Sequence, residues 1–324
     1  MTGRSVFVTG GYGLLGRWLV EALLEQGARV TVLRRDHVPH AALVLDGLEG
    51  RCTVVDGDVT DAAVLERALG EHEVEVVFHL AAQTIVGTAR RSPVPTFEAN
   101  VRGTWLLLEA CRHVGMGAVV VAASDKAYGP ADELPYTEEH ALAPTAPYDV
   151  SKACTDLVAR AYFHAYGVPV ATTRFANLYG GGDLNRSRLV PEAVAAALAG
   201  RAPVIRSDGT PERDFLAAED AAAAYLAIAD ALLDPAGGAR GEAFNAGGDR
   251  PHSVLEVVDA VCRAAGADVH PDVRGTGTLD GEIDRQWVDS SKLRALTGWR
   301  PLIDLEEGLR RTVAWYQAHP GVLG

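Results

Sequence analysis

The chain has 324 residues, 48% of them hydrophobic and 23% charged, a composition that is ordinary for a globular enzyme and a length that allows more than one domain. Its formal net charge of −13 argues against a nucleic-acid backbone as a partner, and no apolar run is long enough to span a membrane. The first residues lack the basic, apolar and small-residue pattern of a signal peptide, so we expect a cytoplasmic protein.

The first half of the chain alternates apolar, β-branched runs with stretches of helical periodicity. We expect strands at residues 5–10, 28–33, 52–58, 74–82, 117–124 and 168–175, and helices at 14–26, 61–69, 97–113 and 148–166. Because the strand-like runs are apolar on both faces, the sheet should be parallel and covered by helices on both sides. The pattern therefore predicts an α/β fold with a doubly wound parallel sheet, a Rossmann fold.

After Asn177 the pattern loosens into loop-rich segments, with helical stretches at 191–199 and 305–319. We expect this half to form a smaller, partly interleaved C-terminal substrate lobe that covers the carboxyl ends of the strands, where ligands bind in such sheets. The predicted domains are a dinucleotide-binding Rossmann domain over 1–176, to which 214–246 return, and a substrate lobe made mainly of 177–213 and 247–324.

The stretch "VTGGYGLLGRWL" places Gly10, Gly13 and Gly16 between the first strand and the first helix. Glycine permits a tight turn, close approach of a pyrophosphate and close packing of the helix on the strand. The helix N-terminus then offers backbone donors and a positive dipole end to the phosphates. In this strand–turn–helix context the three glycines predict a dinucleotide site.

The second strand ends in "VTVLRRDH", which bears on the choice of cofactor. Asp36 would bind the ribose 2′-hydroxyl of NAD, whereas Arg34 and Arg35 would accept the 2′-phosphate of NADP. We expect NAD, with NADP as the alternative. Asp58, in "VVDGDVTD", is expected either at the adenine or at the N-cap of the next helix.

The stretch "PYDVSK" places Tyr148 and Lys152 four residues apart, on one face of a helix. A phenol is a poor base at neutral pH, but a lysine one turn away and a positive nicotinamide can lower its pKa. Ser124, at the end of the preceding central strand, could hydrogen-bond the same substrate oxygen. A lone tyrosine–lysine pair is usually just a helix surface, but together with the glycine turn and Ser124 it is a much more specific signal of a catalytic site.

At this point the chain resembles the extended short-chain dehydrogenase/reductases that act on nucleotide sugars, the NAD-dependent epimerase/dehydratase family. The resemblance covers nearly the whole chain and includes "TGGYGLLG", "GDVTD", "HLAAQ", "ANVRGT", "PYDVSK", "RFANLYG", "RDF" and "VDSSKLRALTGW". Three local matches, "HLAAQTIV", "SDKAY" and "GGGDLNRSRLVP", resemble the CDP-glucose 4,6-dehydratase branch. The departures "GTARRSP" and "SDGTPERDF" leave the base of the nucleotide open between CDP, dTDP, GDP and UDP.

The resemblance implies a role for each of several residues. Ser124, Tyr148 and Lys152 would be the catalytic triad. The cofactor would be bound by Gly10, Gly13, Leu14, Leu15, Gly16, Arg34, Asp36, Asp58, Val59, Leu80, Ala81, Ala82, Tyr148 and Lys152. The nucleotide sugar would be bound by Gln83, Asn177, Leu189, Arg213 and Arg285, although for each arginine a surface ion pair is the alternative.

Asp125 and Lys126 follow Ser124, where 4,6-dehydratases of the family carry the acid and base for water elimination. In the implied cycle Tyr148 takes the C4 hydroxyl proton as hydride passes to the cofactor, a base removes the C5 proton while Asp125 protonates the departing C6 hydroxyl, and hydride returns to C6. Lys126 can be that base only if its pKa falls. The alternative is an Asp125–Lys126 ion pair that shapes a loop. Tyr128 is a second candidate near C5 or C6, or it only packs.

The predicted function is thus that of an NDP-hexose 4,6-dehydratase. A nucleotide-sugar 4-epimerase is the nearest alternative and a non-catalytic dinucleotide sensor a more distant one. We expect His79 and Asn100 to be structural or near the cofactor, and no metal site, because the histidines lack companions at ligand spacing. In this family the helices at 97–113 and 148–166 pair as a four-helix bundle, which implies a homodimer, unless both are buried within one subunit.

Overall fold

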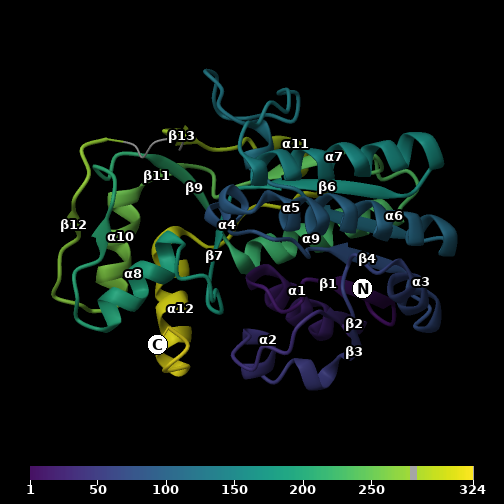
Figure 1. Ribbon diagram of the computed structural model, residues 1–324, viewed down its shortest axis with the longest axis horizontal. Helices are drawn as coiled ribbons and strands as arrows, with labels where there is room; N and C mark the ends of the chain where they lie inside the picture. Colours follow the sequence, from purple (N-terminus) through teal and green to yellow (C-terminus); the bar gives the residue numbers. More distant parts are fainter. Residues whose placement is uncertain (278–282, 324) are drawn as a thin grey trace.

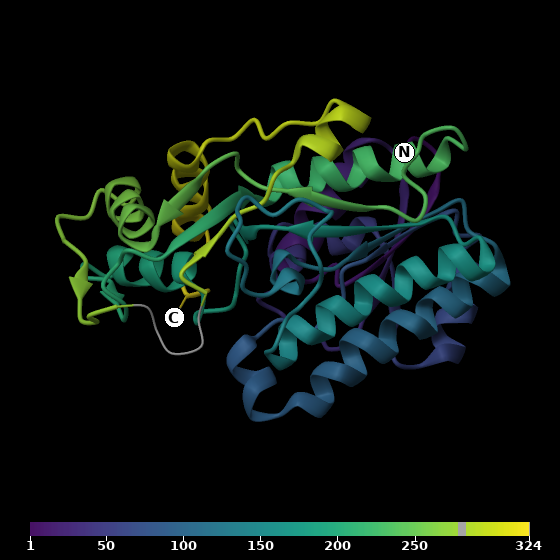
Figure 2. The same ribbon diagram turned by 90° about the horizontal axis from the view of Figure 1, so that it is seen from above.

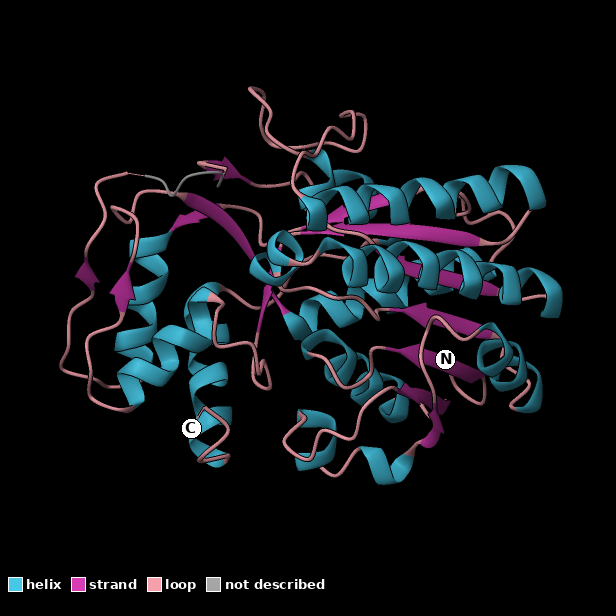
Figure 3. Cartoon of the chain, in the orientation of Figure 1, coloured by secondary structure: helices cyan, strands magenta, loops and turns pink. Residues whose placement is uncertain are grey.

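The computed structural model describes residues 1–277 and 283–323, and a seven-stranded sheet lies at its centre (Figures 1 and 3). Its strands are β1 (Ser5–Thr9), β2 (Arg29–Arg34), β3 (Thr53–Asp56), β4 (Val76–His79), β5 (Ala118–Ala122), β6 (Val170–Phe175) and β10 (Ala243–Ala246). They lie in the order β10-β6-β5-β4-β1-β2-β3, and every neighbouring pair is parallel. The predicted doubly wound parallel sheet is confirmed.

Helices cover both faces of this sheet, as the doubly apolar strands require (Figure 2). One face packs against α1 (Leu14–Glu25), α9 (Ala218–Leu233) and α11 (Ser291–Thr297). The other packs against α3 (Ala62–Glu71), α6 (Gly103–Val114) and α7 (Pro147–Tyr166). Alternate residues of a strand enter opposite cores: Val120 packs with the α1 side, and Val119 and Val121 with the α7 side.

The helix predicted at 97–113 is divided in the structure. The short helices α4 (Val86–Arg91) and α5 (Pro93–Phe97) lead into a π-helical turn at Glu98–Arg102, and only then does α6 begin. The side chain of Asn100, in this turn, accepts from the backbone N–H of Gln83 at 2.7 Å and donates to its carbonyl oxygen at 3.1 Å. The widened turn therefore fixes the chain that follows β4, at the carboxyl edge of the sheet.

The second half of the chain contributes β10, α9 and α11 to the central layers and otherwise forms a second body with its own core. This body contains β7 (Asn177–Tyr179), β8 (Val204–Ile205), β9 (Glu212–Ala217), β11 (Pro251–Ser253), β12 (Asp272–Val273), β13 (Arg285–Gln286), α8 (Leu189–Leu198), α10 (Val254–Ala264) and α12 (Leu305–Ala318). Helices α8 and α12 confirm the helical stretches predicted there, whereas the short strands were not predicted. A further short helix, α2 (Ala42–Leu45), follows β2. The predicted domain limits stay a prediction.

None of the helices among residues 1–277 and 283–323 is long and apolar enough to cross a membrane.

Candidate active site

A cleft of about 1080 Å³ opens at the carboxyl ends of the central strands, beneath the second body. Nineteen predicted site residues line it: Gly10, Gly13, Leu14, Leu15, Gly16, Asp36, Asp58, Val59, Leu80, Ala81, Ala82, Ser124, Asp125, Lys126, Tyr148, Lys152, Asn177, Leu189 and Arg213. The predicted residues that do not line it are Arg34, Gln83 and Arg285. Residues distant in the sequence thus meet in one cavity.

Each of the three glycines of the first turn meets a different constraint. Gly10 has a φ of +74°, and a Cβ there would lie 2.7 Å from the backbone of Leu80 and Ala81. A Cβ on Gly16 would overlap the carbonyl oxygen of Gly10. At Gly13 a Cβ would meet only the Gly10 oxygen, at 3.4 Å, which is an ordinary contact. The contacts within the chain therefore do not require glycine at position 13. Gly13 is the N-cap of α1 and lines the cleft, which fits its predicted role in the close approach of a pyrophosphate.

Replacing Gly13 by alanine should lower the affinity for NAD at least about tenfold, because the methyl group would occupy the side from which the pyrophosphate approaches. Gly16→Ala is the comparison variant: its methyl group would overlap the Gly10 carbonyl oxygen within the cofactor turn, so it should lower thermal stability as well as NAD affinity. Calorimetric titration with NAD and thermal melting of both variants measure the two effects. Unchanged NAD affinity in Gly13→Ala would contradict this assignment.

The three residues at the end of β2 that bear on the choice between NAD and NADP do not all face the cleft. Asp36 and Arg35 line the cleft and form an exposed ion pair, with 2.6 Å between Arg35 Nε and Asp36 Oδ2. Arg34 turns away, because its guanidinium binds the carboxylate of Asp56 at 2.6 and 3.0 Å and that of Glu49 at 3.3 Å. Arg34 is therefore held away from the cleft, whereas Asp36, the residue predicted to bind the NAD ribose, lines it beside Arg35.

Asp58 lines the cleft but caps no helix. Its Oδ1 accepts from the backbone N–H and the hydroxyl of Thr60, at 2.8 and 2.7 Å. The N-cap of α3 is Asp61, whose side chain accepts from the backbone N–H groups of Ala63 and Val64. The alternative role of Asp58 as a helix cap is therefore wrong, and its place in the cleft fits the predicted contact with the adenine.

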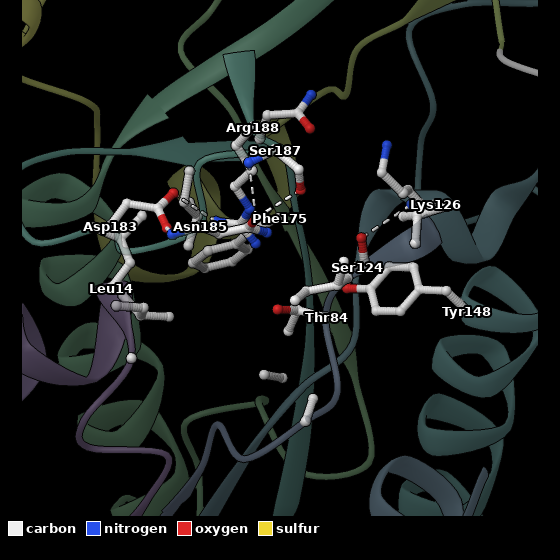
Figure 4. Close-up of a pocket in the computed structure, with 18 of the residues that line it drawn as sticks. Leu14, Thr84, Ser124, Lys126, Tyr148, Phe175, Asp183, Asn185, Ser187 and Arg188 are labelled. Carbon is white, nitrogen blue, oxygen red and sulfur yellow. Dashed lines mark hydrogen bonds and ion pairs between the residues drawn. The ribbon is translucent and has the colours of Figure 1, made fainter. Parts of the chain in front are cut away.

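The predicted catalytic residues converge where β5 and α7 face one another (Figure 4). Ser124, just after β5, donates from its hydroxyl to Asp125 Oδ1 at 3.0 Å, and it lies close enough to the phenol of Tyr148 to lower the pKa of that phenol. Tyr148 and Lys152 lie one turn apart on α7, and Lys152 Nζ donates to the carbonyl oxygen of Ala122 at 2.7 Å. The predicted serine, tyrosine and lysine are thus neighbours in the fold.

Burial governs the protonation of this group. It raises the pKa of Tyr148 to about 12, with the nearby Arg188 lowering it in part, and it lowers the pKa of Lys152 to about 8. The sequence predicts that Lys152 lowers the pKa of Tyr148, but Lys152 is held by a backbone carbonyl and the effect of burial on the phenol dominates. A positive charge brought beside the phenol would lower the pKa of Tyr148 and prepare it to accept a proton.

Asp125 and Lys126, which follow Ser124, line the same cleft. Asp125 is 2% exposed, and burial raises the pKa of its carboxyl, although Lys126 and the hydrogen bond from Ser124 oppose this. Its Oδ2 atom is buried without a hydrogen-bond partner. Lys126 Nζ donates to Gln286 Oε1 at 3.4 Å, so the two side chains have separate partners. A buried carboxyl whose pKa is raised is better suited to act as an acid than an exposed aspartate is.

Tyr128 points away from this site and packs in the interior. Its ring stacks on Tyr136 with centroids 4.7 Å apart, and its hydroxyl donates to Asn245 Oδ1 at 2.7 Å. It lies outside the set of residues that line the cleft. Of the two roles considered for Tyr128, the structure favours packing.

The predicted substrate residues are divided between the cleft and its surroundings. Leu189 begins α8, and Asn177 donates to the carbonyl oxygen of Asp214 at 3.3 Å. Arg213 donates to the carbonyl oxygens of Glu212 and Asp284 at 2.9 and 3.0 Å.

Arg285 and Gln83 bind neighbouring protein groups rather than the cleft. Arg285 forms an ion pair with Glu212 at 2.8 Å and lies over the ring of Trp287. The amide oxygen of Gln83 accepts from the backbone N–H of Ile85. Arg285 is therefore held against β9, and Gln83 is held within its own loop.

His79 and Asn100 have structural partners, in agreement with the prediction. The buried His79 ring lies between the hydroxyls of Thr9 and Thr104, at 2.8 and 3.1 Å. Burial lowers the pKa of His79 to about 3, so the ring is neutral at physiological pH.

Several polar residues of the cleft were not singled out from the sequence, among them Arg90, Asp149, Arg188 and Gln286. Asp149 follows Tyr148, and its Oδ1 atom is buried without a partner. Burial raises the pKa of Asp149 to about 6, with the charge of Lys126 opposing it. The position beside Tyr148 in "PYDVSK" was a usable signal for Asp149. Gln286 gave none, because it lies on a two-residue strand in a loop-rich segment.

Comparisons with known proteins agree with this geometry. The model of the "NAD dependent epimerase/dehydratase family" matches residues 6–247. A dTDP-glucose 4,6-dehydratase from Xanthomonas campestris pv. campestris is 33% identical over 331 aligned residues, which cover 95% of this chain and 92% of that protein.

Solved structures of enzymes with two different activities share this fold. The dTDP-glucose 4,6-dehydratase of Streptomyces venezuelae, solved with NAD bound, is 32% identical with a TM-score of 0.86 over 98% of both chains. The UDP-glucose 4-epimerase of Thermotoga maritima, solved with UDP-glucose, is 27% identical with a TM-score of 0.88 over 97% of this chain and 99% of that one. With the glycine turn, the strand-end serine and the tyrosine–lysine pair in one cleft, this chain is an enzyme that belongs to the NAD-dependent epimerase/dehydratase family.

Proposed function

We propose that the protein is an NDP-hexose 4,6-dehydratase, which converts a nucleotide hexose into its 4-keto-6-deoxy form. The observation that carries this proposal is Asp125, a buried carboxyl with a raised pKa beside the Ser124–Tyr148 pair. An epimerase has no need of an acid there, because it cleaves no C–O bond. The relatives named dTDP-glucose 4,6-dehydratase support the same activity.

The residues of the cleft can perform the proton transfers of this reaction. NAD, when bound, would supply the hydride chemistry, with oxidation at C4 of the sugar and reduction at C6. Tyr148 takes the proton of the C4 hydroxyl, while Ser124 hydrogen-bonds the same oxygen. Lys152 binds the cofactor ribose beside Tyr148 and adds positive charge.

Water elimination falls to the residues that follow Ser124. The ketone at C4 acidifies the C5 proton, and Lys126, once it has lost its own proton, is the predicted base that removes it. Asp125 gives its proton to the C6 oxygen as the C6–O bond breaks, so that water leaves and a C5–C6 double bond forms. Both residues line the cleft together with Ser124, which they follow in the chain.

The sequence motifs and the named relatives indicate different nucleotide bases. The motifs resemble the CDP branch, whereas the named bacterial relatives act on dTDP-glucose. Mass spectrometry of products from CDP-, dTDP-, GDP- and UDP-hexoses, with NAD or NADP, identifies both the reaction and the nucleotide. We expect the loss of one water from one nucleotide hexose.

A nucleotide-sugar 4-epimerase is the second candidate, because structures with that activity share the fold. Its product would have an unchanged mass and a new retention time on chromatography. That result would contradict the dehydratase proposal and would leave Asp125 and Lys126 as structural residues.

We also propose that the protein is a homodimer formed through α6 and α7. These helices lie side by side on the outside of the sheet (Figure 2), and large apolar side chains are exposed along this face. Trp105 is 41% exposed, Leu157 54% and Tyr166 61%. Pairing α6 and α7 with their copies in a four-helix bundle would cover them.

Replacing Leu157 by glutamate should therefore convert the dimer to a monomer, because a charge at the centre of an apolar interface is costly to desolvate. Light scattering coupled to gel filtration measures the mass of each species. Leu302→Glu is the matched control, since Leu302 is 88% exposed and lies outside α6 and α7. A wild-type protein that is monomeric at all concentrations would contradict the proposal.

A further inference from the structure

Three buried side-chain atoms without a hydrogen-bond partner gather in one part of the cleft. Among the described residues they are Asp125 Oδ2, Asp149 Oδ1 and Gln286 Nε2. Buried polar atoms are rarely left unpaired in a folded protein, and a cleft is where a ligand can pair them. Asp125 and Gln286 are the most enclosed of the three, with exposures of 2% and 1%.

The orientation of the Gln286 amide follows from its neighbour. Gln286 lies on β13, opposite Arg213 of β9, and Lys126 Nζ donates to its Oε1 at 3.4 Å. Because an ammonium group can only donate, the amide oxygen must face Lys126. The NH₂ group therefore points the other way, as a buried donor with nothing to accept from it.

Asp125 presents the complementary group. Its Oδ1 accepts from the Ser124 hydroxyl at 3.0 Å, which leaves Oδ2 unpaired. Both residues adjoin Lys126, Asp125 through the chain and Gln286 through its hydrogen bond. An unpaired amide donor and an unpaired carboxyl oxygen thus flank the same lysine and line the same cleft.

A single hydroxyl group can pair with both atoms. Its oxygen accepts a hydrogen bond from Gln286 Nε2, and it forms a second hydrogen bond with Asp125 Oδ2. We propose that Gln286 binds the C6 hydroxyl of the substrate hexose together with Asp125, and so selects sugars that carry this hydroxyl. The inference rests on the proposed function and assigns a substrate-binding role to a residue on the second body of the protein.

The arrangement also suits the chemistry of elimination. Gln286 donates to a lone pair of the C6 oxygen and holds it against Asp125. When the C6–O bond breaks, its electron pair stays on the oxygen, which takes the proton of Asp125 and leaves as water. The base takes the C5 proton, and the electron pair of the broken C5–H bond forms the C5–C6 double bond. Gln286 itself gives up no proton.

Two substitutions of similar size test the assignment. Gln286→Met removes both amide groups, and Gln286→Glu keeps an acceptor for Lys126 but replaces the donor by a carboxylate oxygen. The probes are dTDP-glucose and dTDP-6-deoxyglucose, or the corresponding UDP pair if the wild-type protein binds uridine nucleotides more tightly. Calorimetry on the NAD-loaded protein measures the affinity for each sugar.

We expect the wild-type protein to prefer the sugar with the C6 hydroxyl by about tenfold, and Gln286→Met to lose this preference. The loss should come from weaker binding of dTDP-glucose, with the affinity for the 6-deoxy sugar unchanged. Gln286→Glu should bind dTDP-glucose weakly at pH 8 and recover part of the affinity at lower pH, where a protonated carboxyl can donate.

Equal or absent binding of the two sugars by the wild-type protein would overturn the inference. So would a full preference retained by Gln286→Met, or an equal loss for both sugars, which indicates a general structural role. Failure of the proposed function is a separate result: the wild-type enzyme would return an epimer instead of a dehydrated product. The binding test still decides the role of Gln286 in that case, because a hexose epimerase substrate also carries the C6 hydroxyl.

Discussion

Replacing Tyr148 by phenylalanine should lower the turnover number about a thousandfold, within the range expected for the loss of a general acid–base group. Phenylalanine keeps the ring, which is 8% exposed, and removes only the hydroxyl that is predicted to accept the proton. Lys152 and the glycine turn are unchanged, so the affinity for NAD should stay within about twofold of the wild-type value. Product mass spectrometry and calorimetric titration with NAD measure the two quantities.

Tyr128→Phe is the matched control, because it removes a buried tyrosine hydroxyl outside the cleft. It should lower stability by about 1 kcal/mol through the lost hydrogen bond to Asn245 and leave turnover near the wild-type value. A Tyr148→Phe enzyme with wild-type turnover would contradict the assigned acid–base role. Loss of NAD affinity in parallel with turnover would indicate instead that the substitution disturbs the whole cleft.

The sheet could be predicted because its signals are local. Apolar runs such as Val119–Val121 are buried on both faces of a parallel sheet, and the spacing of Gly10, Gly13 and Gly16 marks the first turn. The second body was less predictable. Strands of two or three residues, such as β8 and β13, have no periodicity to detect, and their pairing depends on segments far apart in the chain.

The site residues also differ in whether their signal is local or depends on long-range pairing. Ser124, Tyr148 and Lys152 belong to motifs of contiguous residues, and the fold brings them together as expected. Gln286 reaches the cleft only because β13 pairs with β9, more than seventy residues earlier in the chain. Arg285, its neighbour, was predicted to bind substrate but turns to Glu212, since adjacent residues of a strand point to opposite sides.

Replacing Asp125 by asparagine should separate the two halves of the proposed reaction. The amide keeps an acceptor for the Ser124 hydroxyl but has no proton to give to the C6 oxygen. Oxidation at C4 should continue, whereas formation of the 4-keto-6-deoxy product should fall at least about a hundredfold. The expected signs are the absorbance of reduced nicotinamide and, after quenching, a nucleotide sugar lighter by two hydrogens that has lost no water.

The pH dependence should carry the same signature. Burial raises the pKa of Asp125, so its carboxyl keeps the proton to a higher pH than an exposed aspartate does. The protonated form is the one that donates, and the rate of elimination should therefore fall as the pH rises through this pKa. In Asp125→Asn the residual rate should lose this alkaline decline, which a pH–rate profile of single turnovers would show.

Asp220→Asn provides the control for this substitution. Asp220 is also buried, at 5% exposure, and burial raises the pKa of its carboxyl, but it accepts from the backbone of Leu302 and Ile303 away from the cleft. Its substitution should lower stability without changing the product. If Asp125→Asn formed the 4-keto-6-deoxy sugar at the wild-type rate, the proton would have to come from another group, and the cleft offers Asp149, whose pKa burial raises to about 6, as the next acid to test.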